Sequence, residues 1–390
     1  MEHEAEDDLP AEAAFRRSAR TFFSGHLAPR PTSDLPQVMG AGSDDLEPVR
    51  SFLELLGPWA VPGWPEEAGG LGATPTEVAV VAEELARFEA PDLYPCMVGL
   101  SLVGPAVLEH GTPEQQARWL SPIRAGREIW CQLYSEPAAG SDLASLSCRA
   151  VADGGTWRVS GQKVWSSRAH YSHRGLLLAR TDPHQPRHRG ISCFALDMAQ
   201  PGIVVRPLVQ LNGDTHFNEV FLDDVVVADG DRIGPLGGGW KVAMTTLASE
   251  RSAIGQGGAT LEARHVLDLV RASGKAGDPL VRQRAARLVI RLRLAQLNAG
   301  RAGAQPPAMG SAAKIWMSDT IKAAGALAMD LAGPAALAVD GDDLALDRWR
   351  TLFLTGPSLS IRGGTDEVMR TILGERVLGL PPEPRATGGG

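Results

Sequence analysis

Hydrophobic residues recur at helical spacing near both ends of the chain and at alternate positions in its middle, which predicts helices, then strands, then helices. Residues 74–90 begin Thr-Pro-Thr-Glu, a helix start signal, and their apolar positions keep a spacing of three and four: Val78, Val81, Leu85 and Phe88. Residues 112–123 predict another helix, with Thr112 as its cap before Pro113.

The pattern changes to period two after residue 128. Residues 156–167, "TWRVSGQKVWSS", alternate behind an Asp-Gly-Gly turn, and four more apolar runs follow before residue 231. Turns rather than helices separate these runs, so we expect an antiparallel, barrel-like sheet.

Helical spacing returns after Gly237. Residues 278–302 carry the seam of a helix bundle, formed by Val281, Ala285, Leu288, Leu292, Ala295 and Ala299. A second long helix is expected over residues 311–333, and Thr365 opens a third.

The predicted fold class is therefore α+β and multidomain. We expect a helical N-terminal domain (residues 1–127), a middle antiparallel β-barrel (128–235), a C-terminal four-helix bundle (236–384) and a disordered tail (385–390). A Rossmann fold is disfavoured because βαβ alternation is missing, and the glycines of residues 234–240 do not fit G-x-G-x-x-G.

Composition narrows the classes of function. A net charge of −8 over 390 residues argues against nucleic acid as a partner. The four cysteines form no Cys-x-x-Cys pair, so we expect no metal site and buried, reduced thiols, as in a cytoplasmic protein. The acidic N-terminus is unlike a signal peptide, and no apolar run reaches the roughly 18 residues of a membrane span.

Three segments could bind a ligand. Residues 131–145 are rich in small and hydroxyl residues, and Trp165 ends an alternating strand beside two serines. The first segment either binds a ligand through its backbone N–H groups or forms a plain turn. The tryptophan either packs on a planar ring of a ligand or fills the interior as a hydrophobic plug. In residues 359–370, "LSIRGGTDEVMR", two glycines precede Thr365, which can cap a helix. The glycines either turn a corner or let backbone N–H groups approach a ligand.

Together with two further stretches, these segments resemble the acyl-CoA dehydrogenase family of flavoproteins, in its bacterial fatty-acid-degradation type. The segments are, in order, "WCQLYSEPAAGSDLASL", "WRVSGQKVWSSRAHYSHRGLLLARTDP", "FNEVFLDDVVV", "GWKVAMTTLASER" and "IRGGTDEVMRTILGERVLGLP". The resemblance covers about residues 12–384. It implies FAD as cofactor and a homotetramer or heterotetramer.

The resemblance assigns cofactor roles to nine residues. Tyr134 and Ser135 would touch the flavin ring, Trp165 would pack on it and Ser167 would lie near N5. Ser141 would contact both FAD and the pantetheine of the substrate. The other FAD contacts implied, two of them across a dimer, are Arg271, Gln283, Thr365 and Glu367. Departures from the family pattern occur at Ala138, at "RASGK" and at "DLAGP".

The family reaction removes a proton from Cα of an acyl-CoA and passes a hydride from Cβ to flavin N5, giving a 2,3-enoyl-CoA. Many members carry the catalytic carboxylate where this chain has Gly363, whose backbone N–H would instead bind the thioester oxygen. Another subset uses a Glu-Arg pair on a bundle helix, which makes Glu250 the expected base. Arg251 would line the substrate channel, or brace the helix.

Other functions stay open at this stage. The same scaffold could serve a flavin monooxygenase or oxidase, or a weakly active subunit of a mixed tetramer. A dehydrogenase of this family would pass its electrons to an electron-transferring flavoprotein. The pattern does not decide between CoA and an acyl carrier protein as the thioester carrier, nor the length of the acyl chain.

Overall fold

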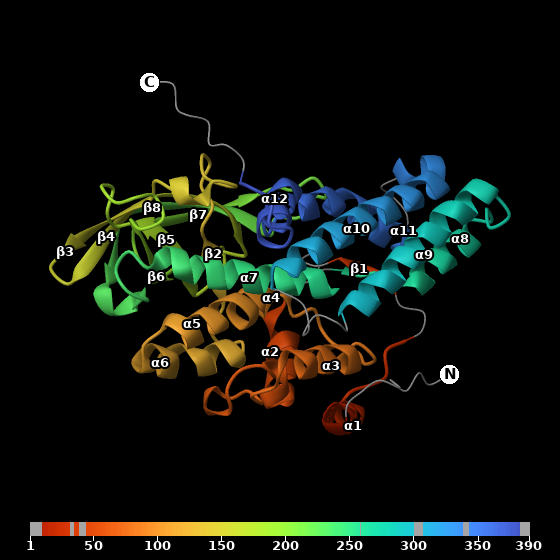
Figure 1. Cartoon of the computed structure of the whole chain (residues 1–390), viewed down its shortest axis with the longest axis horizontal. Coiled ribbons are helices and arrows are strands. Elements are labelled where there is room, and N and C mark those ends of the chain that lie inside the picture. The colour runs from red at the N-terminus through yellow and green to blue at the C-terminus, as the bar shows by residue number, and fades with distance from the viewer. Residues whose placement is uncertain are drawn as a thin grey trace. The chain divides into compact units, whose positions relative to one another are not determined.

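The computed structural model describes residues 10–31, 35–38, 44–257, 259–299, 307–337 and 343–382. By packing, the chain divides into two compact units. The first comprises residues 1–34 and 39–249, and the second comprises residues 35–38 and 250–390. Figure 1 labels the elements of both.

The first unit begins with helices that carry the predicted start signals. Thr74 and Thr112 cap their helices as expected, and the structure adds that each forms a capping box with the residue three positions later. The helices are α1 (Pro10–His26), α2 (Leu46–Leu56), α3 (Pro75–Leu85), α4 (Tyr94–Met97), a π-helical turn (Val98–Val103), α5 (Gly104–His110) and α6 (Pro113–Arg124). Short 3₁₀ turns lie at Gly57–Ala60, Glu66–Ala68, Leu143–Ser145 and Asp229–Asp231.

An eight-stranded sheet follows, in the order β7-β8-β4-β3-β5-β6-β9 with β2 beside β5. Its strands are β2 (Trp130–Leu133), β3 (Arg149–Asp153), β4 (Thr156–Ser167), β5 (Arg174–Arg180), β6 (Ile191–Asp197), β7 (Ile203–Leu208), β8 (Phe217–Ala228) and β9 (Arg232–Ile233). The predicted sheet is confirmed, but it is not wholly antiparallel: β5 pairs in parallel with β2 and with β3. The β3–β4 hairpin lies between β2 and β5 in the chain and supplies the long connection that parallel strands need.

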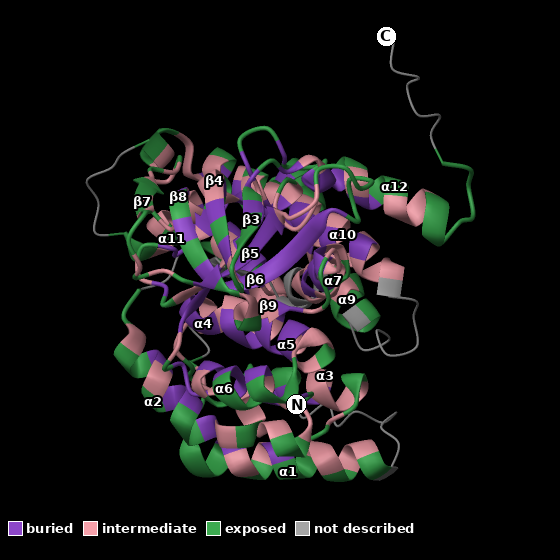
Figure 2. Ribbon diagram, turned by 90° about the vertical axis from the view of Figure 1, so that its left-hand side faces the viewer, coloured by how far each residue is buried: buried purple, intermediate pink, exposed green. Residues whose placement is uncertain are grey.

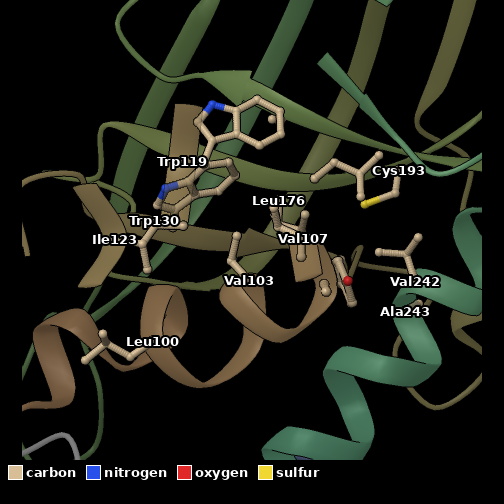
Figure 3. Close-up of a cluster of buried hydrophobic side chains, with 14 of the residues drawn as sticks. Leu100, Val103, Val107, Trp119, Ile123, Trp130, Leu176, Cys193, Val242 and Ala243 are labelled. Carbon is tan, nitrogen blue, oxygen red and sulfur yellow. The ribbon is translucent and has the colours of Figure 1, made fainter. Parts of the chain in front are cut away.

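One hydrophobic core joins the helices to the sheet within this unit (Figure 3). Trp119 of α6 and Trp130 of β2 meet edge to face, with ring centroids 5.6 Å apart. Val242 and Ala243 reach the same core from the start of α7 (Gly239–Gly257). Strands β5 and β6 are buried along nearly their whole length, as the purple ribbon in Figure 2 shows. All four cysteines are buried and free, as expected.

The second unit is mainly helical. It holds the end of α7, then α8 (Ala263–Ala272), α9 (Pro279–Ala299), α10 (Gly310–Ala332), α11 (Leu344–Thr355) and α12 (Asp366–Arg376). Short 3₁₀ turns lie at Pro307–Met309, Gly333–Leu337 and Gly356–Ser360, and β1 (Gln37–Val38) pairs with β10 (Ala259–Thr260). The predicted seam of α9 is buried at Val281, Ala285, Leu288 and Leu292. Within the described residues, no helix has the length and apolarity that a membrane crossing requires.

Candidate active site

A buried ion pair holds the serine-rich loop that follows β2. Lys163 of β4 lies 2.8 Å from Glu136 through Nζ and Oε1, and both side chains are almost fully buried. The lysine also donates to the Tyr134 carbonyl, 3.1 Å away. Glu136 in turn accepts hydrogen bonds from the backbone N–H groups of Ser147 and Cys148. One carboxylate thereby ties both ends of the loop to the sheet.

The surroundings of Glu136 keep its carboxylate charged. Burial by itself raises the pKa of this carboxyl group, because desolvation disfavours the charged form. The charge of Lys163, together with the hydrogen bonds from Lys163, Ser147 and Cys148, outweighs burial, so the net pKa lies below the usual 4.5. The Glu136 carboxylate is therefore ionised at neutral pH.

Trp165 projects from the end of β4 beside this loop. The Val164 N–H donates to the Ser135 carbonyl, 2.9 Å away, which brings the loop against the strand. The register of β4 against β8 shifts between Lys163 and Ser166, and Trp165 has a left-handed φ of 60°. Such bulges redirect side chains. The indole is 60% exposed, and it meets the Phe217 ring edge to face with ring centroids 6.1 Å apart. An interior plug would be buried, so this geometry favours a planar ligand.

The hydroxyls expected to bind the cofactor lie in different environments. Ser141 is exposed beside Gly140, whose missing side chain leaves open space, whereas Ser135 and Ser167 are half-buried. The Tyr134 hydroxyl is buried and shares a 2.9 Å hydrogen bond with Thr246 of α7. The Tyr134 side chain therefore joins the loop to α7.

Helix α7 carries the expected base. Glu250 is half-buried and follows Thr246 by four residues, so the two side chains lie on the same face of the helix. The side chain of Arg251 lies outside the described residues. Its predicted role in the substrate channel stays a prediction.

In the second unit, the two glycines form a left-handed turn. Gly363 and Gly364 have φ values of 69° and 95°, which residues with side chains rarely adopt. A Cβ added to Gly364 would lie 2.5 Å from Cε of Met369. Thr365 then caps α12 as predicted, because its hydroxyl accepts from the Val368 N–H at 3.2 Å.

A second buried lysine holds this turn. Lys314 of α10 is fully buried, and its Nζ lies 2.8 Å from the Gly364 carbonyl and 2.8 Å from Asp366. Sequence reasoning missed Lys314 and Lys163 as site residues. Each lysine occupies a position where the hydrophobic pattern predicts a buried side chain. A buried lysine requires a carboxylate partner, and this could have indicated both residues.

The remaining predicted cofactor residues do not meet this turn through any described contact. Arg271 pairs with Asp268 on its own helix at 2.8 Å, and Gln283 is exposed on α9. Glu367 is exposed in the first turn of α12. Their roles, two of them across a dimer, stay predictions.

The groups found in each unit fit a flavin nucleotide. In the first unit, an exposed indole can cover a flat ring, and the open serine loop offers hydroxyls and N–H groups for phosphate. In the second unit, the left-handed turn has glycine at both positions. Family models match in the expected order: the acyl-CoA dehydrogenase N-terminal domain at residues 10–127, the middle domain at 131–225 and the C-terminal domain at 237–378. The chain belongs to the acyl-CoA dehydrogenase family.

Similar proteins agree with this membership. The acyl-CoA dehydrogenase IpdE1 of Mycobacterium tuberculosis is 41% identical over 332 residues, which cover 83% of this chain and 85% of IpdE1. The solved structure called Tcur3481-Tcur3483 steroid ACAD has a TM-score of 0.79 at 28% identity, covering 96% of this chain and 99% of that one. The ChsE4-ChsE5 complex of M. tuberculosis has a TM-score of 0.77 at 28% identity, covering 98% and 100%.

These matches confirm the expected fold class of helical, β and helical domains. The chain is an acyl-CoA dehydrogenase, and members of its family depend in general on FAD.

Proposed function

We propose that Glu250 removes the α-proton of an acyl-CoA while the Gly363 N–H binds the thioester oxygen. The observation that carries this proposal is the position of Glu250 on α7, one turn beyond Thr246 and on the same face. Gly363 has no side chain that could act as a base, and the carboxylate of nearby Asp366 is held by Lys314.

The chemistry of a thioester requires both a base and a hydrogen-bond donor. Its α-proton is only weakly acidic, so a hydrogen bond to the carbonyl oxygen must accompany removal by a positioned carboxylate. Gly363 adds no side chain of its own at this left-handed position. FAD, when bound, supplies the acceptor for the β-hydride.

We infer that the acyl group is bulky and related to a steroid rather than to a straight-chain fatty acid. A relative that spans nearly all of this chain is described as a steroid ACAD, and this revises the fatty-acid metabolism implied by the sequence motifs. The carrier is taken to be CoA, as in the names of the curated relatives.

We also propose that the chain works in a complex of two different subunits. Two similar structures carry paired names, Tcur3481-Tcur3483 and ChsE4-ChsE5. In this chain, Val209 and Leu211 after β7 are 78% and 79% exposed, which suits a surface for a partner subunit. An electron-transferring flavoprotein would accept the electrons.

Anaerobic titration of the yellow protein with steroid-type and straight-chain acyl-CoA thioesters tests this function. We expect a steroid-type thioester to bleach the flavin, and Glu250→Gln to slow bleaching by roughly 10²- to 10⁴-fold. Glu375→Gln, an exposed acid near the end of α12, serves as the control and should leave the rate unchanged.

Unchanged bleaching in the Glu250→Gln protein refutes the assignment of the base. Absence of bleaching by every thioester, combined with rapid oxygen consumption after reduction, favours the alternative of an oxidase or monooxygenase. Bleaching only after addition of a second subunit supports the mixed complex.

A further inference from the structure

Arg168, directly after β4, has buried hydrogen-bond donors without acceptors. Its side chain is 3% exposed, its Nε donates to Asp44 at 2.6 Å, and its guanidinium lies 4.5 Å from the centre of the Tyr94 ring. Nη1 and Nη2 are also buried, yet neither has a hydrogen-bond partner in the described parts of the chain. Buried donors of a charged group are rarely left in this way.

The backbone at this position is unfavourable as well. Arg168 has a φ of 54°, in the left-handed region that residues with side chains seldom occupy. Its N–H is held by the His216 carbonyl at 2.7 Å, which fixes the direction in which the side chain leaves the strand. Such strain persists at positions with a functional requirement.

The charges around Arg168 decide which kind of acceptor suits Nη1 and Nη2. Asp44 balances the guanidinium, and Asp214 lies 3.3 Å from His216. Burial, with the charge of Arg168, lowers the pKa of His216 and favours its neutral form. Tyr171 donates to Asp44, and His170 lies 3.8 Å from the same carboxylate. Since the positive charge is already matched, a second anion gains little, and a neutral oxygen fits better.

The location of Arg168 connects two parts of the proposed site. It follows Ser167, which the family resemblance places near the flavin, and it stacks on Tyr94, the first residue of α4. Helix α4 leads directly into the π-helical turn Val98–Val103, a feature that is frequent at functional sites. Arg168 therefore lies between the segment that the resemblance assigns to the flavin and a backbone irregularity typical of functional sites.

We propose that Arg168 recognises a neutral ketone or hydroxyl oxygen on the acyl part of the substrate, through Nη1 and Nη2. This inference rests on the proposed function and defines its substrate class more narrowly. Asp44 and the Tyr94 ring hold the guanidinium plane, so its two donors present a rigid fork. A bulky acyl group without such an oxygen leaves them unpaired and should bind more weakly.

Two thioesters of the same skeleton test the proposal: 3-(4-oxocyclohexyl)propanoyl-CoA and 3-cyclohexylpropanoyl-CoA. We expect the wild-type, FAD-loaded protein to bind the oxo compound roughly 10- to 100-fold more tightly in anaerobic calorimetry. Arg168→Met should remove this preference and leave the dissociation constant of the cyclohexyl compound unchanged. Arg168→Lys, which keeps the charge beside Asp44 but loses the fork, should retain a reduced preference.

Arg180→Met is the matched control, because Arg180 is half-buried at the end of β5 and, among the described residues, donates to three backbone carbonyls. It should change stability without changing the preference. Equal wild-type affinities for both thioesters mean that Nη1 and Nη2 bind structural water only, and they overturn the proposal. So does an equal loss of both affinities in Arg168→Met. If the protein prefers the oxo thioester but no thioester bleaches the flavin, only the proposed function is overturned. If thioesters bleach the flavin but the oxo compound binds no more tightly, only the role of Arg168 is overturned.

Discussion

Lys163 and Lys314 each bridge a carboxylate and a backbone carbonyl, one in a segment that the resemblance assigns to cofactor binding and one in the turn that holds Gly363. Lys163 holds Glu136 and the Tyr134 carbonyl, whereas Lys314 holds Asp366 and the Gly364 carbonyl. Removing one partner of such a pair leaves an uncompensated buried charge, which costs more than the pair itself contributes.

Lys163→Met should lower the free energy of unfolding by about 3–5 kcal/mol, because Glu136 then remains buried and charged without its cation. Denaturant unfolding followed by circular dichroism measures this change. Lys241→Met, at an exposed position of α7, is the control and should stay within about 0.5 kcal/mol of wild type. A loss below about 1 kcal/mol for Lys163→Met contradicts the proposed anchor.

Lys314→Met should have a comparable cost of about 3–5 kcal/mol and should also lower the catalytic rate, since the Gly364 carbonyl loses its donor. Lys314→Arg is not expected to restore either property, because a planar guanidinium does not fit the site of a compact ammonium. Steady-state kinetics below the unfolding transition separates the effect on rate from the effect on stability. A normal rate in folded Lys314→Met protein contradicts the role of this lysine in the turn.

Threonine caps stabilise the N-termini of three helices. The glycine turn needs no side chain for its left-handed backbone, and Thr365 then satisfies an N–H group that the first turn of α12 leaves unpaired. The same device begins α3 and α6, where Thr74 and Thr112 act as caps.

Thr365→Ala should destabilise the protein by about 1 kcal/mol, because the Val368 N–H loses its acceptor. Thr371→Ala provides the comparison within the same helix. The Thr371 hydroxyl is exposed and bonds back to the Glu367 carbonyl, so its loss should be nearly neutral. Thermal unfolding of the two variants measures the difference, and equal melting temperatures would exclude a contribution from the cap.

In the whole molecule, neighbouring cations lower the pKa values of several carboxylates, although partial desolvation raises them. They are Asp44, Glu84, Glu136 and Asp366. At a pH between the lowered and the usual pKa, the unfolded chain binds more protons than the folded chain. The contribution of these carboxylates to the free energy of unfolding is therefore complete above the usual pKa, which is 3.8 for Asp and 4.5 for Glu. It is lost as the pH falls through the lowered pKa values.

The free energy of unfolding should therefore fall steeply below about pH 4. Glu136→Gln should be less stable than wild type at pH 7, and its stability should depend less on pH between about 5 and 3. Glu375→Gln, for which the structure shows no salt bridge among the described residues, should keep the wild-type slope. Urea unfolding at a series of pH values measures both slopes, and parallel curves for Glu136→Gln and wild type contradict the ionic pair.

The order of helices, strands and helices was predictable, because hydrophobic period and capping are local properties of the chain. Val281 and Leu288 on the seam of α9, Thr365 as a cap and the buried cysteines all follow from such patterns. The family resemblance supplied Glu250, Gly363 and the flavin contacts, whose catalytic and binding roles stay predictions. Parallel pairing of β2 with β5 was not predictable, since it depends on how a distant hairpin folds.

Local pattern alone thus determined the class of each element and the family motifs that it carries. Only the tertiary structure decided which charges meet, because their partners are far apart in sequence. Glu136 and Lys163 are 27 residues apart, Lys314 and Asp366 are 52 apart, and Asp44 and Arg168 are 124 apart. Each pair forms because a buried charge requires an opposite charge nearby. The packing of the elements determines which residue lies close enough to supply it.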